Sequence, residues 1–175
     1  MDTEFSYAHY LFIQSQIIYR DKTVALGTAS DKMFAPIAKY NPAGEALQSA
    51  LPWLEQHTPA NATLAVLPEG IMVNYLSRRT NPTHFLVWNP VELAMFGSDN
   101  MTAAFERNAP DYIMLIHRDA AEYGAKFFGK QPEFGFELME WIRKNYDEVY
   151  LVGQEPLRDF HFGISILKKR PAQNR

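Results

Sequence analysis

The 175-residue sequence contains no cysteine. A chain without thiols forms no disulfide, offers no thiolate nucleophile and builds no cysteine metal site. Reducing and oxidising compartments both tolerate such a chain, so this absence excludes some chemistry and leaves the compartment open.

The sequence also lacks long apolar runs and an excess of positive charge. Its longest apolar stretches, such as 63–67 and 112–116, are far shorter than the roughly 20 residues that cross a bilayer. Asp2 and Glu4 stand where a secretory signal would carry lysine or arginine. The net charge is −3, from 17 basic and 20 acidic side chains, which gives no general attraction for phosphate backbones. We therefore expect no membrane-spanning segment and no nucleic acid as a partner.

Three signatures of cofactor or nucleophile chemistry are missing as well. No glycine-rich loop follows a predicted strand in the dinucleotide or phosphate-binding pattern. The 5 histidines are scattered without paired metal-ligand spacing. Ser165 lies inside a predicted strand and not on a sharp strand-to-helix turn. We expect no cofactor, no metal and no serine nucleophile.

What the sequence does have is the composition of a packed globular protein. Apolar residues make up 47% and aromatic residues 14%, and the charged fraction of 21% is too low for a disordered chain. The length suits one domain with a sizeable core. We expect a single α/β domain over 31–170, a linker or helix over 1–30 that leads into it, and a short tail over 171–175.

Hydrophobic spacing places the secondary structure along the chain. It predicts helices over 5–19, 42–59, 70–77, 100–108 and 135–146, with helix and strand patterns close to balanced in the first. Short apolar runs predict strands over 24–26, 63–67, 84–88, 111–117, 148–152 and 162–167, with irregular chain from 27 to 41.

The order of these elements predicts the fold class. Helix and strand alternate from 42 to 152, which is the order that βαβ crossovers and a largely parallel sheet produce. We therefore expect an α/β three-layer sandwich. The last two strands lack a helix between them and are compatible with an antiparallel pair at one edge. The terminal strand, which ends in Lys168-Lys169-Arg170, would be that edge, because basic residues discourage further pairing.

Polar residues follow two of the predicted strands, where an open α/β sheet binds its ligands. Pro68-Glu69-Gly70 follows one strand and His117-Arg118-Asp119 another, so on neighbouring strands they would share one rim with Asn74 and Tyr75. Such a cluster suits acid–base chemistry or hydrogen bonds to a sugar. A structural interpretation has at least equal weight: Glu69 can complement a helix dipole, and the other charges can form ion pairs or helix caps.

The rim residues belong to an ordered series of short motifs. The series is Leu67-Pro68-Glu69-Gly70, Asn74-Tyr75-Leu76, Arg78-Arg79, Asn81-Pro82-Thr83, Pro110-Asp111-Tyr112-Ile113, His117-Arg118-Asp119, Glu122-Tyr123-Gly124, Phe128-Gly129 and Phe162-Gly163-Ile164. It resembles the soluble, extracytoplasmic C-terminal domain of bacterial membrane glycosyltransferases of the GT-C superfamily, related to protein O-mannosyltransferases and aminoarabinose transferases.

The resemblance implies a function for the whole parent protein. Such enzymes carry many membrane-spanning helices, use a polyprenyl-phosphate sugar as donor and place catalytic carboxylates in loops beside the membrane. This chain departs from the family by lacking that catalytic module, so no catalytic residue carries over. We expect the parent to be a hexosyltransferase and this chain to be an inactive domain on the periplasmic face of a bacterial membrane. Its partners would be the transmembrane module of the same polypeptide and a glycan or lipid-linked sugar.

On this interpretation one set of residues would bind acceptor, contact the membrane module or hold the domain's own loops together. The set is Glu69, Asn74, Tyr75, Arg78, Arg79, His117, Arg118, Asp119 and Tyr123.

Two alternatives remain open. The chain is compatible with a free-standing α/β hydrolase or transferase for a sugar or phosphorylated compound, with Glu69, His117 and Asp119 as acid and base. It is also compatible with an interaction module whose exposed aromatics, including Phe127 and Phe128, dock a partner.

Overall fold

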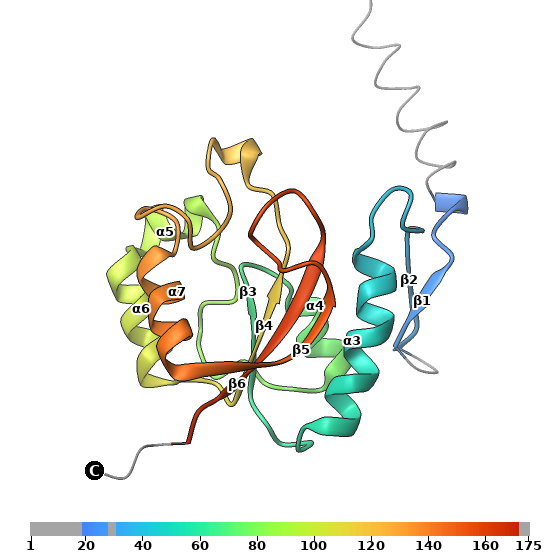
Figure 1. Cartoon of the computed structure of the whole chain (residues 1–175), viewed down its shortest axis with the longest axis horizontal. Coiled ribbons are helices and arrows are strands. Elements are labelled where there is room, and N and C mark those ends of the chain that lie inside the picture. The colour runs from blue at the N-terminus through green and yellow to red at the C-terminus, as the bar shows by residue number, and fades with distance from the viewer. Residues whose placement is uncertain (1–18, 28–30, 172–175) are drawn as a thin grey trace, which may run out of the picture. The chain divides into compact units, whose positions relative to one another are not determined.

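The computed structural model describes residues 19–27 and 31–171 (Figure 1). The helix expected over 5–19 lies outside the described residues except for Tyr19, so it stays a prediction. Two compact units divide between Ser49 and Ala50, inside helix α3 (Ala43–His57). The expected domain limits at residues 30 and 170 also stay predictions.

The first unit contains a small antiparallel sheet. Strand β1 (Val24–Leu26) confirms the prediction, and it pairs with β2 (Met33–Ala35). The β2 segment was expected to be irregular. The prediction missed this strand because three residues are too few to show an alternating pattern. Helix α3 begins where predicted, and the Asn41 side chain accepts a hydrogen bond from the Ala43 amide at 2.9 Å.

The second unit is built on a four-stranded mixed sheet. Its strands are β3 (Leu64–Leu67), β4 (Tyr112–Ile116), β5 (Tyr146–Gly153) and β6 (Gly163–Lys169), in the order β3-β4-β6-β5. Only β3 and β4 pair in parallel, whereas β6 is antiparallel to both of its neighbours. The expected three-layer sandwich with a largely parallel sheet is therefore wrong.

The error has a physical cause in strand β6. Since β6 runs antiparallel to β4 and to β5, the chain direction of β5 does match that of β4, as the helix between them predicts. Strand β6 nevertheless lies between them and separates the two. Its first four residues are all buried, and a continuous apolar run reports burial on both faces and not strand direction. The last two strands do pair antiparallel, but the edge strand is β5 and not the terminal one.

The helices of this unit follow the predictions at three places. Helices α4 (Ile71–Ser77), α6 (Ser98–Arg107) and α7 (Phe136–Asn145) lie close to their expected ranges. Helix α5 (Pro90–Phe96) was not predicted.

The strand expected over 84–88 is wrong. This segment has no regular structure. Its Trp88 is 1% exposed, and the Trp88 amide donates to the Pro68 carbonyl at 2.7 Å. The aromatic run therefore fills the core with a ring and does not pair as a strand.

The main core lies on one face of this sheet. Figure 1 shows α5, α6 and α7 gathered on the same side of the strands. They bury Leu93, Met101, Phe105, Leu138 and Ile142 against Ala65, Leu67, Ile113 and Leu115 of the sheet. Phe128 belongs to this core and is 1% exposed, and Phe127 packs against it. These two rings therefore do not form the exposed patch that an interaction module would need.

The turn between β5 and β6 brings two backbone segments into very close approach. A Cβ added at Gly163 would lie 1.6 Å from the Gln154 carbonyl oxygen. The same atom at Gly124 would meet nothing within 4 Å, although Gly124 has φ +69. Gly163 is therefore required by contact, and Gly124 only by its backbone conformation.

We expect Gly163→Ala to lower the free energy of unfolding by about 3 kcal/mol or more, because the turn must open to admit the methyl group. The control Gly124→Ala should cost only about 1–2 kcal/mol, from its left-handed conformation. Urea denaturation of the two variants measures both values. Equal losses would contradict the close approach.

Candidate functional site

The parallel pairing of β3 and β4 brings two of the predicted motifs together. Leu67 lies opposite Leu115 in the register, so both strands end at the same edge of the sheet. Glu69 follows β3 by two residues and Arg118 follows β4 by two. The expectation that these motifs share a rim is confirmed for Glu69 and Arg118.

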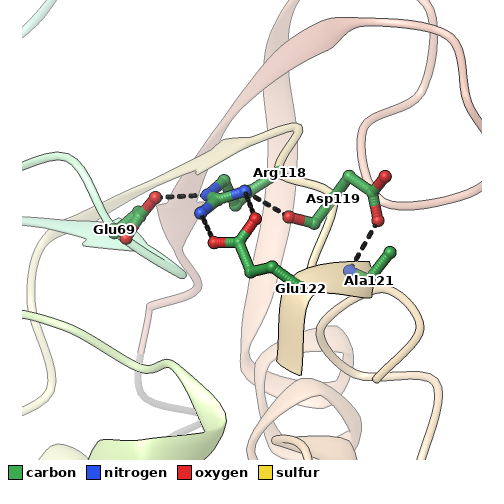
Figure 2. A network of polar contacts seen from close by, with 5 residues as sticks. All are labelled: Glu69, Arg118, Asp119, Ala121 and Glu122. Atoms are coloured by element: carbon green, nitrogen blue, oxygen red, sulfur yellow. Dashed lines mark hydrogen bonds and ion pairs between the residues drawn. The ribbon is translucent and has the colours of Figure 1, made fainter. Parts of the chain in front are cut away.

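Arg118 is the centre of a charged network at this rim (Figure 2). Its Nε donates to Glu69 Oε1 at 2.5 Å, and Nη1 donates to Glu122 Oε2 at 3.2 Å. Its Nη2 also donates to Glu122, and Nη1 donates to the Asp119 carbonyl. Asp119 uses its carboxylate to accept from the Ala121 amide at 2.9 Å, which holds the start of the 3₁₀ turn η3 (Ala121–Tyr123). We call Glu69, Arg118, Asp119 and Glu122 the Arg118 network.

Arg118 supplies a fixed positive charge to the network. The hydrogen bonds that the guanidinium donates, first to Glu122 and then to Glu69, raise the pKa of Arg118 above its ordinary value. The guanidinium is therefore always charged, and it serves as a clamp between two carboxylates. The side chains are 34% exposed for Arg118, 40% for Glu69 and 51% for Glu122, so another molecule can reach them.

The structure gives Glu69 a tertiary contact, and its expected role at the helix dipole stays a prediction. Helix α4 starts after Gly70 without a side-chain hydrogen bond at its cap. Glu69 reaches across to the neighbouring strand end instead, where it meets Arg118. Its contact is tertiary and joins residues 49 positions apart.

The space beside the network is small. A hollow with a volume of about 10 Å³ lies there. It is lined by Glu69 and Arg118 and by Pro68, Pro90, Tyr123 and Phe134. A hollow of this size holds about one water molecule. This hollow is therefore too small to hold a substrate.

His117 turns toward aromatic rings. Its ring centroid lies 5.2 Å from that of Phe127 and 5.9 Å from that of Phe162, and its Nδ1 accepts from the Leu157 amide at 3.4 Å. Burial lowers the pKa of His117 below its ordinary value, against the opposing effect of nearby Asp119. Within residues 19–27 and 31–171, no hydrogen bond or ion pair joins His117 to Glu69.

Asn74 lies away from the rim where it was expected. Its side-chain amide donates to the Leu64 carbonyl at 2.7 Å and to the Arg79 carbonyl at 2.9 Å. Leu64 is the first residue of β3, whereas Glu69 follows the last. Helix α4 runs back along β3, so the Asn74 side chain binds the backbone at the end of β3 opposite to Glu69.

Arg79 is a structural residue at that same end. It is 6% exposed, and it donates to the Thr58 hydroxyl at 2.9 Å and to the carbonyls of Ser77 and Leu54 at 2.7 and 2.9 Å. Leu54 and Thr58 stand at the carboxyl end of α3, where free carbonyls attract a cation. Burial lowers the pKa of Arg79, while Glu55 acts in the opposite direction.

Tyr75 and Arg78 form an exposed pair on α4. The Arg78 guanidinium carbon lies 4.4 Å from the centroid of the Tyr75 ring, which is cation–π geometry. Arg78 ends the helix with φ 55 and ψ 30. The predicted site residues therefore fall into three groups. Those at the rim are Glu69, Arg118, Asp119 and Tyr123, and His117 lies among aromatic rings. Those on α4 or directly after it are Asn74, Tyr75, Arg78 and Arg79.

A larger cavity lies where no residue was predicted. It measures about 290 Å³ and lies between α7, the last two strands and the segment after β5. At its wall the Ser165 hydroxyl, 2% exposed, donates to Glu148 Oε2 at 2.6 Å. The sequence signal for this site was the polar residue Ser165 between two apolar residues, Ile164 and Ile166. From the sequence we considered Ser165 as a nucleophile and not as a hydrogen-bonding group.

Comparisons of the chain with models of protein families, with curated proteins and with solved structures give no match. Within the described part of the chain, no three His, Asp or Glu side chains gather in a set that could hold a metal ion. No helix of that part combines the length and the apolar character needed to cross a membrane.

We expect Arg79→Lys to lower the free energy of unfolding by about 2–4 kcal/mol, because an ammonium cannot reach all the carbonyls that the planar guanidinium satisfies. At about 2–4 °C per kcal/mol for a chain of this length, the loss is visible in a thermal melt. The control Arg107→Lys, on the exposed last turn of α6, should change stability by less than about 0.5 kcal/mol. Equal melting temperatures of both variants would contradict the structural role.

For Glu69→Gln we expect a loss of at most about 1 kcal/mol, since exposed ion pairs contribute little. The loss should shrink further at about 1 M salt, where the Debye length is about 3 Å. Thermal melts at low and high salt measure it, with Glu106→Gln, exposed on α6, as the matched control. A salt-independent drop several times larger would instead make Glu69 a structural support of the turn.

Proposed function

We propose that this chain is the soluble, non-catalytic domain of a bacterial membrane glycosyltransferase of the GT-C superfamily. The parent would transfer a sugar from a polyprenyl-phosphate donor on the periplasmic face. The domain would assist acceptor binding or stabilise the transmembrane module of the same polypeptide. The resemblance of the motif series is the starting point of this proposal.

One observation carries the proposal beyond that resemblance. Three of the motifs, separated by up to about fifty residues, meet in the Arg118 network, where Glu69, Arg118 and Glu122 are linked by hydrogen bonds. Side chains from three motifs of one series that also meet in space form a single surface feature. A fixed guanidinium between reachable carboxylates suits contact with hydroxyl or charged groups of a partner.

Apolar side chains beside the network support a docking role. Ile71 and Met72 follow Glu69 closely in the chain and are 51% and 48% exposed. Val91 is 49% exposed and comes directly after Pro90, which lines the hollow next to Arg118. A charged centre with exposed apolar neighbours is the composition expected where a domain meets another protein surface or a membrane interface.

A second candidate is a free-standing α/β enzyme that acts on a sugar or phosphorylated compound. The cavity of about 290 Å³ favours it, because enzymes bind small substrates in such spaces. The acid–base set of Glu69, His117 and Asp119 lends it no support, since His117 packs against Phe127 and Phe162 and not against Glu69.

The coding sequence upstream of Met1 distinguishes the two candidates. We expect a continuous reading frame that encodes several apolar segments of about 20 residues each. The protein expressed from that frame should transfer sugar from a polyprenyl-phosphate donor in proteoliposomes, and the 175-residue chain alone should not. A stop codon directly before Met1, or transfer by the isolated chain, would contradict the proposal.

In the same assay Arg118→Met should reduce transfer by about tenfold, within the range of 1–3 kcal/mol typical of coupling between sites. Arg107→Met is the matched control and should retain the rate. Thermal melts of both variants separate a loss of contact from a loss of folding. Full activity of Arg118→Met would remove the network from the function.

A further inference from the structure

The cavity between α7 and the last two strands has the form of a small-ligand site. Its volume of about 290 Å³ lies at the lower end of the range of about 300–1,000 Å³ typical of ligand pockets. Its floor consists of buried apolar side chains, among them Phe128, Met139, Ile142 and Leu157, which are 1–7% exposed. Such a floor packs against the apolar side of a ligand.

Two hydrogen-bond acceptors stand together on the wall of this cavity. The Ser165 hydroxyl donates its single proton to Glu148 Oε2 at 2.6 Å. Both groups therefore offer only lone pairs to a ligand, since a hydroxyl has one proton and a carboxylate has none. Tyr146 also lines the cavity, and its hydroxyl donates to the Pro110 carbonyl, outside the lining, at 2.6 Å. A ligand that fits this wall must bring donors, and two adjacent donors fit it best.

The charges around the cavity cancel. Arg170 pairs with Asp147 at 2.8 Å, and both line the cavity. Two more charged residues of the lining pair with residues outside it: Arg143 pairs with Glu140, and Glu155 pairs with Arg158. Among the described residues this leaves Lys130 and Glu148 without an ion pair, one charge of each sign. A ligand matched to this lining carries no net charge.

We propose that this cavity binds one monosaccharide unit. A pyranose is neutral, presents vicinal hydroxyls that donate to the Glu148 and Ser165 oxygens, and packs its C–H face on the apolar floor. The ammonium group of Lys130, which also lines the cavity, can donate to a ring or hydroxyl oxygen. This inference is drawn from the cavity alone and does not rest on the proposed function.

The test is a titration of the ¹⁵N-labelled 175-residue chain with D-mannose, D-glucose, D-galactose and N-acetyl-D-glucosamine, followed by amide NMR. L-alanine, a zwitterion without net charge, and L-glutamate, an anion, serve as comparators. We expect saturable shifts with at least one sugar, centred on the amides of Leu157, Ser165 and Leu167, which line the cavity. Glu148→Gln should weaken binding by about tenfold or more, because it removes the charge from a hydrogen-bond acceptor.

Two further variants keep the result interpretable. Ser165→Ala removes the second acceptor and should weaken binding by about threefold to tenfold. Glu137→Gln, on the first turn of α7 and outside the lining, should leave binding unchanged. No saturation with any sugar, saturation only with the amino acids, or shifts confined to the Arg118 network would each overturn the proposal.

Discussion

The position of strand β6 determines the rest of the second unit. Its hydrogen bonds join β4 on one side and β5 on the other, and without them β5 would have no partner in the sheet. Because β6 lies beside β4, the connection from β4 through α7 must cross β6 before the chain forms β5 at the edge of the sheet. The cavity lies between α7 and these two strands, so it is a consequence of the same placement. The close approach of Gly163 and Gln154 closes the turn on which this arrangement depends.

Two arginines show how the same side chain serves structure at one end of the sheet and surface chemistry at the other. Arg79 is buried and satisfied by carbonyl groups and a hydroxyl, and burial lowers its pKa. Arg118 is part-exposed and held by carboxylates, and hydrogen bonds raise its pKa. Loss of the first leaves buried acceptors unpaired and costs folding free energy. Loss of the second changes mainly what the surface offers to a partner.

The sequence predicted local features well and the arrangement of strands poorly. Amphipathic spacing located α3, α4, α6 and α7, and the parallel pairing of β3 and β4 placed Glu69 beside Arg118 as expected. The partner Glu122 stood in the motif series but not among the candidate site residues, although it lies four residues after Arg118. Strand direction was not predictable, because the apolar run of β6 records burial on both faces, which parallel and internal antiparallel strands share. The cavity was out of reach because it depends on how α7 and the segment after β5 pack against these strands, which hydrophobic spacing does not give.

The rim and the cavity are in contact at more than one place. The centroid of the Phe128 ring in the cavity lining lies 5.3 Å from that of the Phe134 ring beside the Arg118 network, and His117 makes a second contact. His117 stands next to Arg118 in the chain, and its Nδ1 accepts from the amide of Leu157, which lines the cavity. The Phe127 and Phe162 rings hold the imidazole in place, and its lowered pKa keeps it neutral and able to accept at neutral pH. This hydrogen bond therefore links the lining of the cavity to the residue that precedes Arg118.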